Sequence, residues 1–235
     1  MRATSLVLAL ICAPASVALG APLVRAEPTL AADAARAADP LSKTPDLGPV
    51  PPNEETLSNT AGACPDAWIA PLAGEESDLA VARLTPASYP FEVTHVRYAL
   101  DNSGLKEGRI TCSAAYAHEV EIFVDGATRP PEHPQILQRW HVAGVTASQP
   151  LVVRSLALEA PVVLEKGQHL FVAVRAAGKY PSTLCMAACG GPSVPKDRNY
   201  WGKDGAQASW PMLASFNLAY SFRFEAIGFS RTRRP

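Results

Sequence analysis

The sequence lacks an excess of charge of either sign, because 21 lysines and arginines stand against 22 aspartates and glutamates. A protein that binds nucleic acid or an anionic membrane through electrostatics needs a basic surface, and this balance does not indicate one. Beyond position 26 the sequence also lacks an apolar run of the about 20 residues that a membrane-spanning helix requires. We therefore expect no nucleic-acid partner and no membrane span in the mature chain.

Motifs of catalysis and metal binding are missing as well. The sequence has no Gly-x-Ser-x-Gly elbow, no glycine-rich phosphate loop and no histidine pair with ligand spacing. In "HEVEI" (118–122), Ile122 stands where a metalloprotease motif has its second histidine. Structural calcium at "DNSG" (101–104) or "DRN" (197–199) is less favoured than turns made by the same Asp and Asn side chains. We predict a protein that is not an enzyme and holds no cofactor.

The N-terminal region predicts export. Residues 1–26 have an early positive charge at Arg2, an apolar run from Leu6, and small residues that fit cleavage after Gly20 or Ala26, which is the layout of a signal peptide. Residues 27–60 are rich in Ala, Pro and acidic residues and lack aromatics, so we predict a disordered spacer. A β-sandwich domain is expected over 61–229 and a basic tail over 230–235. The mature protein is expected in the periplasm, at the cell surface or outside the cell.

Alternating apolar and polar residues predict strands across the domain, with no helical apolar stripe of useful length. Pro161 predicts a bulge or an edge in its strand, and Ile136, Trp140 and Val142 are expected on one face of theirs. Short strands separated by turns predict an all-β fold, an antiparallel sandwich of the jelly-roll or galactose-binding-like kind. The expected strands are 78–84, 92–100, 118–124, 136–142, 151–164, 169–176 and 217–229.

Four cysteines remain after Cys12 leaves with the signal peptide, namely Cys64, Cys112, Cys185 and Cys189. An even number in an exported chain predicts two disulfides. The pairing favoured from the sequence is Cys185–Cys189 with Cys64–Cys112. Alternating strand directions also bring Cys112 to the same end of the sandwich as the 185 segment, so a bond between these two stays open.

The stretch "STLCMAACGGPSVPKDRNYWG" (182–202) is predicted as a long loop closed by Cys185–Cys189. Flat aromatic faces beside polar side chains are typical of sugar and peptide sites. Alternatively, the tryptophans pack against the rim of the sandwich and Asp197 pairs with Arg198 to order the loop. The predicted ligand contacts are Trp201 and Trp210 as faces and Asp197, Arg198 and Asn199 as polar groups.

Six segments, "YPFEVTHVRYAL", "AHEVEIFV", "GQHLFVAV", "LCMAAC", "DRNYW" and "SWP", occur in this order. Together they resemble exported, uncharacterised β-sandwich modules of high-GC Gram-negative bacteria, over about residues 63–229. The resemblance implies one sandwich with a cysteine-closed loop and brings no activity. We therefore predict an exported, non-catalytic binding or surface-adhesion module for an unidentified extracellular or envelope ligand, a glycan or a peptide. The alternatives are a structural envelope or matrix protein without a small ligand and, less favoured, an exported hydrolase.

Overall fold

The computed structural model describes residues 24–25, 53–60, 66–71, 73–75, 77–106, 110–191, 195–203, 210–216 and 218–231. The predicted cleavage sites, most of the spacer, Cys12, Cys64 and the end of the tail lie outside these residues. The described part of the chain folds as an antiparallel β-sandwich, which confirms the predicted fold class. No helix among the described residues is long and apolar enough to cross a membrane.

The larger sheet has eight strands in the order β1-β3-β14-β5-β17-β2, with β10 paired to β5 and β16 paired to β14. Its centre is β5, which pairs with β10 along one edge and with β17 and β14 along the other. The strands are β1 (Val24–Arg25), β2 (Glu55–Ser58), β3 (Asp66–Ala70), β5 (Phe91–Asp101), β10 (Leu151–Leu164), β14 (Cys185–Gly190), β16 (Tyr220–Phe222) and β17 (Phe224–Ser230).

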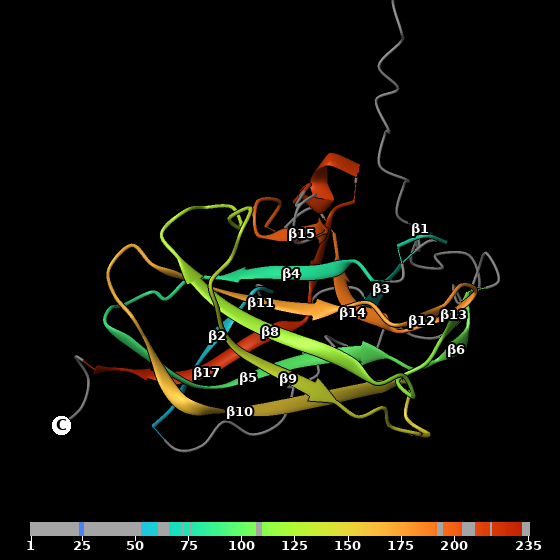
Figure 1. The fold of residues 1–235 in the computed structure, drawn as a ribbon, viewed down its shortest axis with the longest axis horizontal. Helices are drawn as coiled ribbons and strands as arrows, with labels where there is room; N and C mark the ends of the chain where they lie inside the picture. The colour runs from blue at the N-terminus through green and yellow to red at the C-terminus, as the bar shows by residue number, and fades with distance from the viewer. Residues whose placement is uncertain are drawn as a thin grey trace, which may run out of the picture.

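The second sheet has five strands in the order β15-β4-β11-β8-β9, and β4, β11, β8 and β9 follow one another down the view of Figure 1. A small four-stranded sheet has the order β12-β13-β7-β6, and a 3-10 helix, η3, covers Leu213–Phe216. The remaining strands are β4 (Leu79–Leu84), β8 (His118–Asp125), β9 (Ile136–Val142), β11 (His169–Arg175), β15 (Asn199–Gly202), β6 (Gly104–Leu105), β7 (Thr111–Cys112), β12 (Gly178–Lys179) and β13 (Ser182–Thr183).

The main core lies between the two larger sheets and follows directly from period-two alternation. Alternate residues of β5, β8 and β11 point inward, apart from an irregularity in β5 between Val93 and His95, and most of these side chains are at most 1% exposed. Burial of each such aliphatic or aromatic side chain stabilises the fold by about 1.5–3 kcal/mol. The inward residues of these three strands include Val96, Tyr98, Leu100, Val120, Ile122, Leu170, Val172 and Val174.

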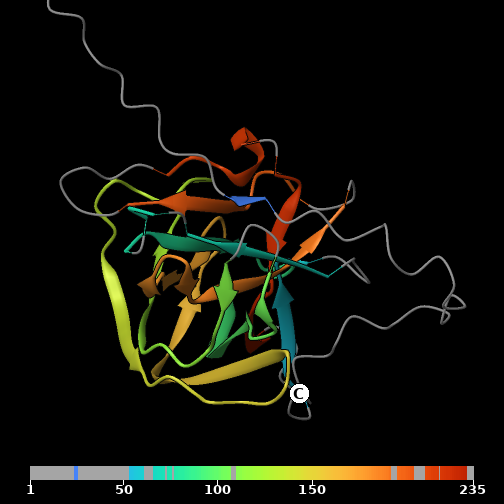
Figure 2. The same ribbon diagram turned by 90° about the vertical axis from the view of Figure 1, so that its right-hand side faces the viewer.

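The edge strands β9 and β10 meet at one corner of the molecule, where both are yellow in Figure 2. The backbone N–H of Glu159 on β10 donates to the side-chain oxygen of Gln138 on β9, over 3.1 Å. The pairing of β10 with β5 shifts register between Ala157 and Val162, which confirms the bulge expected around Pro161. Proline has no N–H to donate to a ladder, so it is tolerated at an edge and in a bulge.

One face assignment in β9 was wrong. The pairing of β8 with β9 shifts register between Ile122 and Phe123. As a result, Trp140 and Val142 join the main core, whereas Ile136 packs against Phe123 on the opposite face of the sheet. A bulge adds one residue to one strand and so reverses the face of the residues beyond it.

The sandwich begins earlier than the sequence indicated. The segment 27–60 was predicted as a spacer, but β2 at its end pairs with β17 and buries Leu57 to 8% exposure. A four-residue strand with a single buried aliphatic side chain gives no clear alternation, so the pattern of the sequence did not show it. The prediction of a loop over residues 182–202 was also wrong, because this segment contains β13, β14 and β15.

Candidate functional site

The favoured disulfide pairing was wrong, because Cys185 is bonded to Cys112 with 5.3 Å between their Cα atoms. Cys185 and Cys189 lie four residues apart on the extended strand β14, which separates their Cα atoms by roughly 13 Å. A disulfide requires Cα atoms within about 7 Å, so these two cannot bond each other. Cys189 is itself disulfide-bonded. The observed bond is the alternative that strand direction had left open, and it matches an oxidising compartment.

Two of the predicted ligand contacts are core residues. Trp201 is 2% exposed and packs in the main core, 6.4 Å from the ring centroid of Phe222. Asn199 is 1% exposed; its amide donates to the hydroxyl of Ser221 over 3.0 Å, and its side-chain oxygen accepts from the backbone N–H of Phe222. The structure therefore contradicts the prediction that Trp201 and Asn199 contact a ligand at the surface.

Asp197 and Trp210 lie on the outer face of the smaller sheet, and Arg198 precedes β15, where its carbonyl accepts from the backbone N–H of Arg83 over 2.8 Å. Asp197 is 65% exposed and pairs with Arg83 over 2.8 Å, rather than with Arg198. Trp210 is half-buried, donates its indole N–H to the carbonyl of Pro131 over 3.0 Å, and packs on a second apolar cluster. This cluster contains Leu79, Val81, Phe123, Phe171, Ala173 and Tyr200. Burial raises the pKa of Tyr200, whose hydroxyl donates to the carbonyl oxygen of Asp197 over 2.8 Å. These contacts order the segment, and its residues do not gather into one site.

A pocket of about 400 Å³ lies on the outer face of the larger sheet, at the end of β5, and we name it the Asp101 pocket. Its floor is apolar, because Ala187 and Leu151 pack there with Ala99 as a cluster separate from the main core. Charged and hydroxyl side chains surround this floor. The lining residues are Ala67, Asp101, Ser103, Lys106, Pro150, Leu151, Ala187 and Arg223.

Asp101 forms the centre of the polar rim. Its Oδ1 accepts from the backbone N–H of Ser103 over 2.9 Å and from the Ser103 hydroxyl over 2.6 Å. Its Oδ2 accepts from the ammonium of Lys106 over 3.0 Å, and this ammonium also lies 5.8 Å from the ring centroid of Trp68. The "DNSG" segment thus forms the turn that was expected there, with Gly104 at a φ of 77° that glycine adopts readily. Among the described residues, no group of three or more His, Cys, Asp or Glu is arranged to hold a metal ion.

Two residues make the frame of the Asp101 pocket rigid. The side chain of Asn102 donates to the carbonyls of Ala147 and Gln149, over 2.9 and 3.1 Å, and so fixes the loop before β10 against the end of β5. The backbone of Arg223 donates to Ala187 on β14 and accepts from Ala99 on β5, over 3.0 and 3.1 Å. Arg223 therefore bridges two strands that diverge at this point, and this residue, only 4% exposed, is part of the pocket lining.

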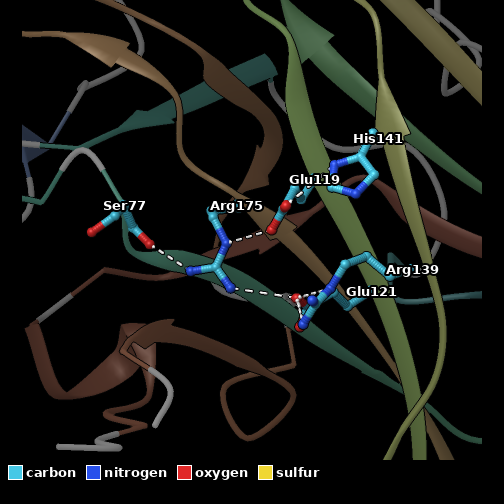
Figure 3. Close-up of polar contacts among 6 residues, drawn as sticks. All are labelled: Ser77, Glu119, Glu121, Arg139, His141 and Arg175. Atoms are coloured by element: carbon cyan, nitrogen blue, oxygen red, sulfur yellow. Dashed lines mark hydrogen bonds and ion pairs between the residues drawn. The ribbon is translucent and has the colours of Figure 1, made fainter.

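A charged cluster on the outer face of the smaller sheet, drawn in Figure 3, joins three strands. The carboxylate of Glu121, 2% exposed, accepts from Arg139 over 2.8 Å and from Arg175 over 3.4 Å. Glu119 contacts Arg175 over 3.1 Å and His141 over 3.2 Å. Both carboxylates are thus paired with guanidinium groups, and for Glu121 this pairing is required because an unpaired buried charge would destabilise the fold. The cluster ties β8, β9 and β11 together.

A buried tyrosine and histidine pair lies inside the sandwich, beside a second pocket of about 320 Å³. The Nδ1 of His118 lies 3.0 Å from the carbonyl of Tyr116, so this nitrogen carries the proton. The Nε2 then accepts from the hydroxyl of Tyr98 over 2.6 Å. Burial lowers the pKa of His118 and raises the pKa of Tyr98, and the Arg154 charge nearby lowers the pKa of both. The pair is neutral at physiological pH.

Comparison with known proteins gives a similarity of fold alone. No family model and no curated protein matches the sequence. The structure is similar to that of the cysteine protease and lectin-like domains of Cwp84, a surface layer associated protein of Clostridium difficile, with a TM-score of 0.47 and 10% identity over 76% of this chain and 36% of that chain. A second structure, clostridial cysteine protease Cwp84 after propeptide cleavage, gives a TM-score of 0.46 and 11% identity over 76% of this chain and 40% of that one. The chain thus spans well under half the length of these proteins, and a similarity at this level assigns neither a ligand nor a site.

Proposed function

We propose that the protein is an exported, non-catalytic binding module that takes a small polar ligand in the Asp101 pocket. The pocket itself carries this proposal. Binding sites for small molecules are concave, mostly apolar and preformed, with a few polar groups that fix the orientation of the ligand, and their volumes begin at about 300 Å³. The pocket combines an alanine and leucine floor with Asp101, Ser103 and Lys106 on a rim that Asn102 holds in place.

Export is part of the proposal. A disulfide between buried cysteines forms and persists in oxidising compartments, and the predicted signal peptide supplies the route to one. We expect the protein recovered from outside the cytoplasm to begin after Gly20 or Ala26, and N-terminal sequencing of that protein tests this. A chain that keeps residues 1–26 would contradict it.

A larger side chain at the floor of the pocket tests the binding proposal, because it occupies the space of the ligand. Ala187→Leu places three extra carbons at a floor position, whereas Ala157→Leu adds the same carbons at an exposed position of β10, outside the pocket. Both variants and the natural protein are screened on a glycan array and a peptide library, after thermal unfolding shows that each is folded. Loss of binding in Ala187→Leu alone supports the proposal.

Two outcomes contradict the proposal. Binding that survives in Ala187→Leu would place the ligand site elsewhere on the molecule. A natural protein that binds nothing in either screen would instead favour the alternative of a structural envelope or matrix protein, which the burial of Trp201 already supports in part.

A further inference from the structure

We infer that the outer face of the smaller sheet carries a second binding site, beside the start of β15, for a tetrahedral oxyanion such as a phosphate or sulfate group. The site is separate from the Asp101 pocket and does not rest on the function proposed for that pocket. Three observations lead to it, namely two arginine residues that lie opposite each other, a guanidinium group without an acceptor, and a tyrosine hydroxyl that brings a third arginine close.

Two arginine residues lie opposite each other next to β15. The backbone N–H of Arg83, on β4, donates to the carbonyl of Arg198 over 2.8 Å, which continues the ladder between β4 and β15 by one pair. Directly opposite residues of an antiparallel pair have Cβ atoms about 5 Å apart, and like charges in such a pair destabilise a sheet. This arrangement therefore lowers stability unless an anion offsets the two positive charges.

The protein supplies a carboxylate for only one of these two arginine residues. Arg83, 6% exposed, donates to the carboxylate of Asp197 over 2.8 Å and to the carbonyl of Thr128. The guanidinium of Arg198 has no acceptor among the described residues, and its Nε is buried without a hydrogen bond. A buried donor without a partner is rare in native proteins, and an ion that binds there is one of the few explanations for it.

A tyrosine hydroxyl brings a third arginine to the same place. The hydroxyl of Tyr200 lies 2.6 Å from the carbonyl of Thr128 and 2.8 Å from the carbonyl of Asp197, so it joins these two segments. The next residue of each segment is an arginine, namely Arg129 and Arg198. Arg129 is exposed and, like Arg198, has no ion pair within the part of the chain that the structure describes. Two unpaired guanidinium groups thus start from neighbouring backbone positions.

A histidine on the adjacent strand β11 reports the positive charge of this face. His169 pairs with Asp125 on β8, and its ring lies 3.0 Å from the hydroxyl of Thr85. Burial lowers the pKa of His169, and the charges of Arg83 and Arg198 lower it further. Asp125 raises this pKa by a smaller amount. The guanidinium groups therefore outweigh the nearby carboxylate at the ring.

A phosphate or sulfate group suits this arrangement better than a carboxylate. Each guanidinium presents its donors in a planar fork that bonds two oxygens at once. A carboxylate has two oxygens, which a single fork occupies, whereas a phosphate ester has three acceptor oxygens. The joint placement of Arg129 and Arg198 therefore favours the anion with more oxygens.

The experiment measures anion binding by isothermal titration of the full chain in a chloride buffer of low ionic strength. The titrants are inorganic phosphate, inorganic sulfate, glucose 6-phosphate as an ester, and acetate as the simple carboxylate. Loss of a charge-assisted donor in Arg198→Gln or in Arg129→Gln should weaken phosphate binding roughly ten- to a hundredfold. Lys179→Gln, which removes an exposed cation on β12 outside this cluster, should leave the affinity unchanged.

Two further readouts separate binding from a structural role of Arg198. Because this guanidinium has no partner and lies opposite another arginine, Arg198→Gln should keep or raise the melting temperature. In proton NMR titrations, phosphate should raise the pKa of His169 in the natural protein, because the anion offsets the arginine charges. The same phosphate concentration should raise it by less in Arg198→Gln.

The possible results each decide one part of the inference. Equal phosphate affinity of the natural protein and Arg198→Gln would overturn the site, and a lower melting temperature of this variant would assign the arginine a structural role instead. Acetate that binds as tightly as phosphate would overturn the ligand class. A natural protein that binds neither phosphate nor sulfate would overturn the whole inference and leave the Asp101 pocket unaffected. Tighter binding of glucose 6-phosphate than of inorganic phosphate supports an ester as the ligand, and equal binding supports the free ion.

Discussion

Removal of the disulfide between Cys112 and Cys185 should lower the free energy of unfolding by about 4 kcal/mol. The bond closes a loop with a sequence separation of 73, and the chain-entropy relation for a loop of this length gives about 4 kcal/mol at 25 °C. Both cysteines are at most 1% exposed and pack with Trp68, Ala70 and Ile110, so alanine is the replacement that keeps this cluster apolar. Since domains are stable by about 5–15 kcal/mol, the double variant should fold with a reduced margin.

The assay is equilibrium unfolding in urea, followed by the fluorescence of Trp68 and Trp201, which are buried in the fold. The variant Cys112→Ala/Cys185→Ala is compared with the natural protein at the same pH, and the slope with urea concentration shows whether both unfold in one step. A loss below about 1 kcal/mol would refute the entropy argument, because a closed loop of this length always restricts the unfolded chain.

Peptide mapping tests the pairing on which this magnitude depends. Met186 lies between Cys185 and Cys189, so trypsin followed by cyanogen bromide separates these two cysteines into peptides 180–186 and 187–196. Without reduction, peptide 180–186 should stay joined to the peptide that begins at residue 110 and contains Cys112. A cross-link between 180–186 and 187–196 would show that the structure has the wrong pairing.

Three further predictions concern single side chains. Because burial lowers the pKa of His118, this side chain is protonated at a higher pH in the unfolded chain than in the folded one. Stability should therefore be full above pH 6.5 and fall below it by up to about 1.4 kcal/mol per pH unit. Urea midpoints measured from pH 8 to pH 5 should depend less on pH in His118→Gln than in the natural protein, and equal dependence would contradict this. Glu121→Gln leaves Arg139 without its carboxylate and Arg175 with Glu119 as its charged acceptor, and should cost about 3 kcal/mol, against less than about 0.5 kcal/mol for the exposed Glu132→Gln, both by urea unfolding. Gly228→Ala places a Cβ 1.9 Å from the backbone oxygen of Glu92 and should lower stability by about 1–3 kcal/mol. In the control Gly126→Ala the new Cβ lies 3.6 Å from the nearest backbone oxygen, so stability should not change. Equal melting temperatures of the two variants would refute this prediction.

The central strands could be predicted from the sequence because their alternation is local. Each of β5, β8 and β11 has one face in the main core, so apolar side chains recur at every second position whatever the neighbouring strands are. The turn at Asp101 was predictable for the same reason, since the side chain bonds the backbone only two residues further on.

The strand β14 could not be predicted in this way. Its sequence "CMAACG" is small and apolar throughout, and all six positions are buried. A strand of this kind is defined by its partners β3, β5 and β16, which lie far away in the sequence. Without the strand, Cys185 and Cys189 looked like neighbours across a loop, and the favoured disulfide followed from that error.

The Asp101 pocket was equally hidden. Its residues run from Ala67 to Arg223, and it forms where β14 and β5 diverge and Arg223 bridges them. No spacing in a single segment indicates such a place. The sequence left open whether Trp201 contacts a ligand or packs against the sandwich, and its burial bears out the second reading. Both faces of its sheet are covered, one by the main core and the other by the cluster of Tyr200 on which Trp210 packs, so an aromatic residue there is buried on either face.

The position where β17 ends determines which way the Asp101 pocket faces when the sandwich is anchored at that end. Glu55 at the start of β2 pairs with Gly228 near the end of β17, so β2 begins beside the point where β17 ends. Ser230 pairs with Phe91, which begins β5, while the Asp101 pocket lies at the other end of the same strand. At about 3.3 Å per residue, β5 separates the two by roughly 33 Å. A sandwich tethered through its C-terminus would hold its pocket at the opposite end, directed away from its anchor.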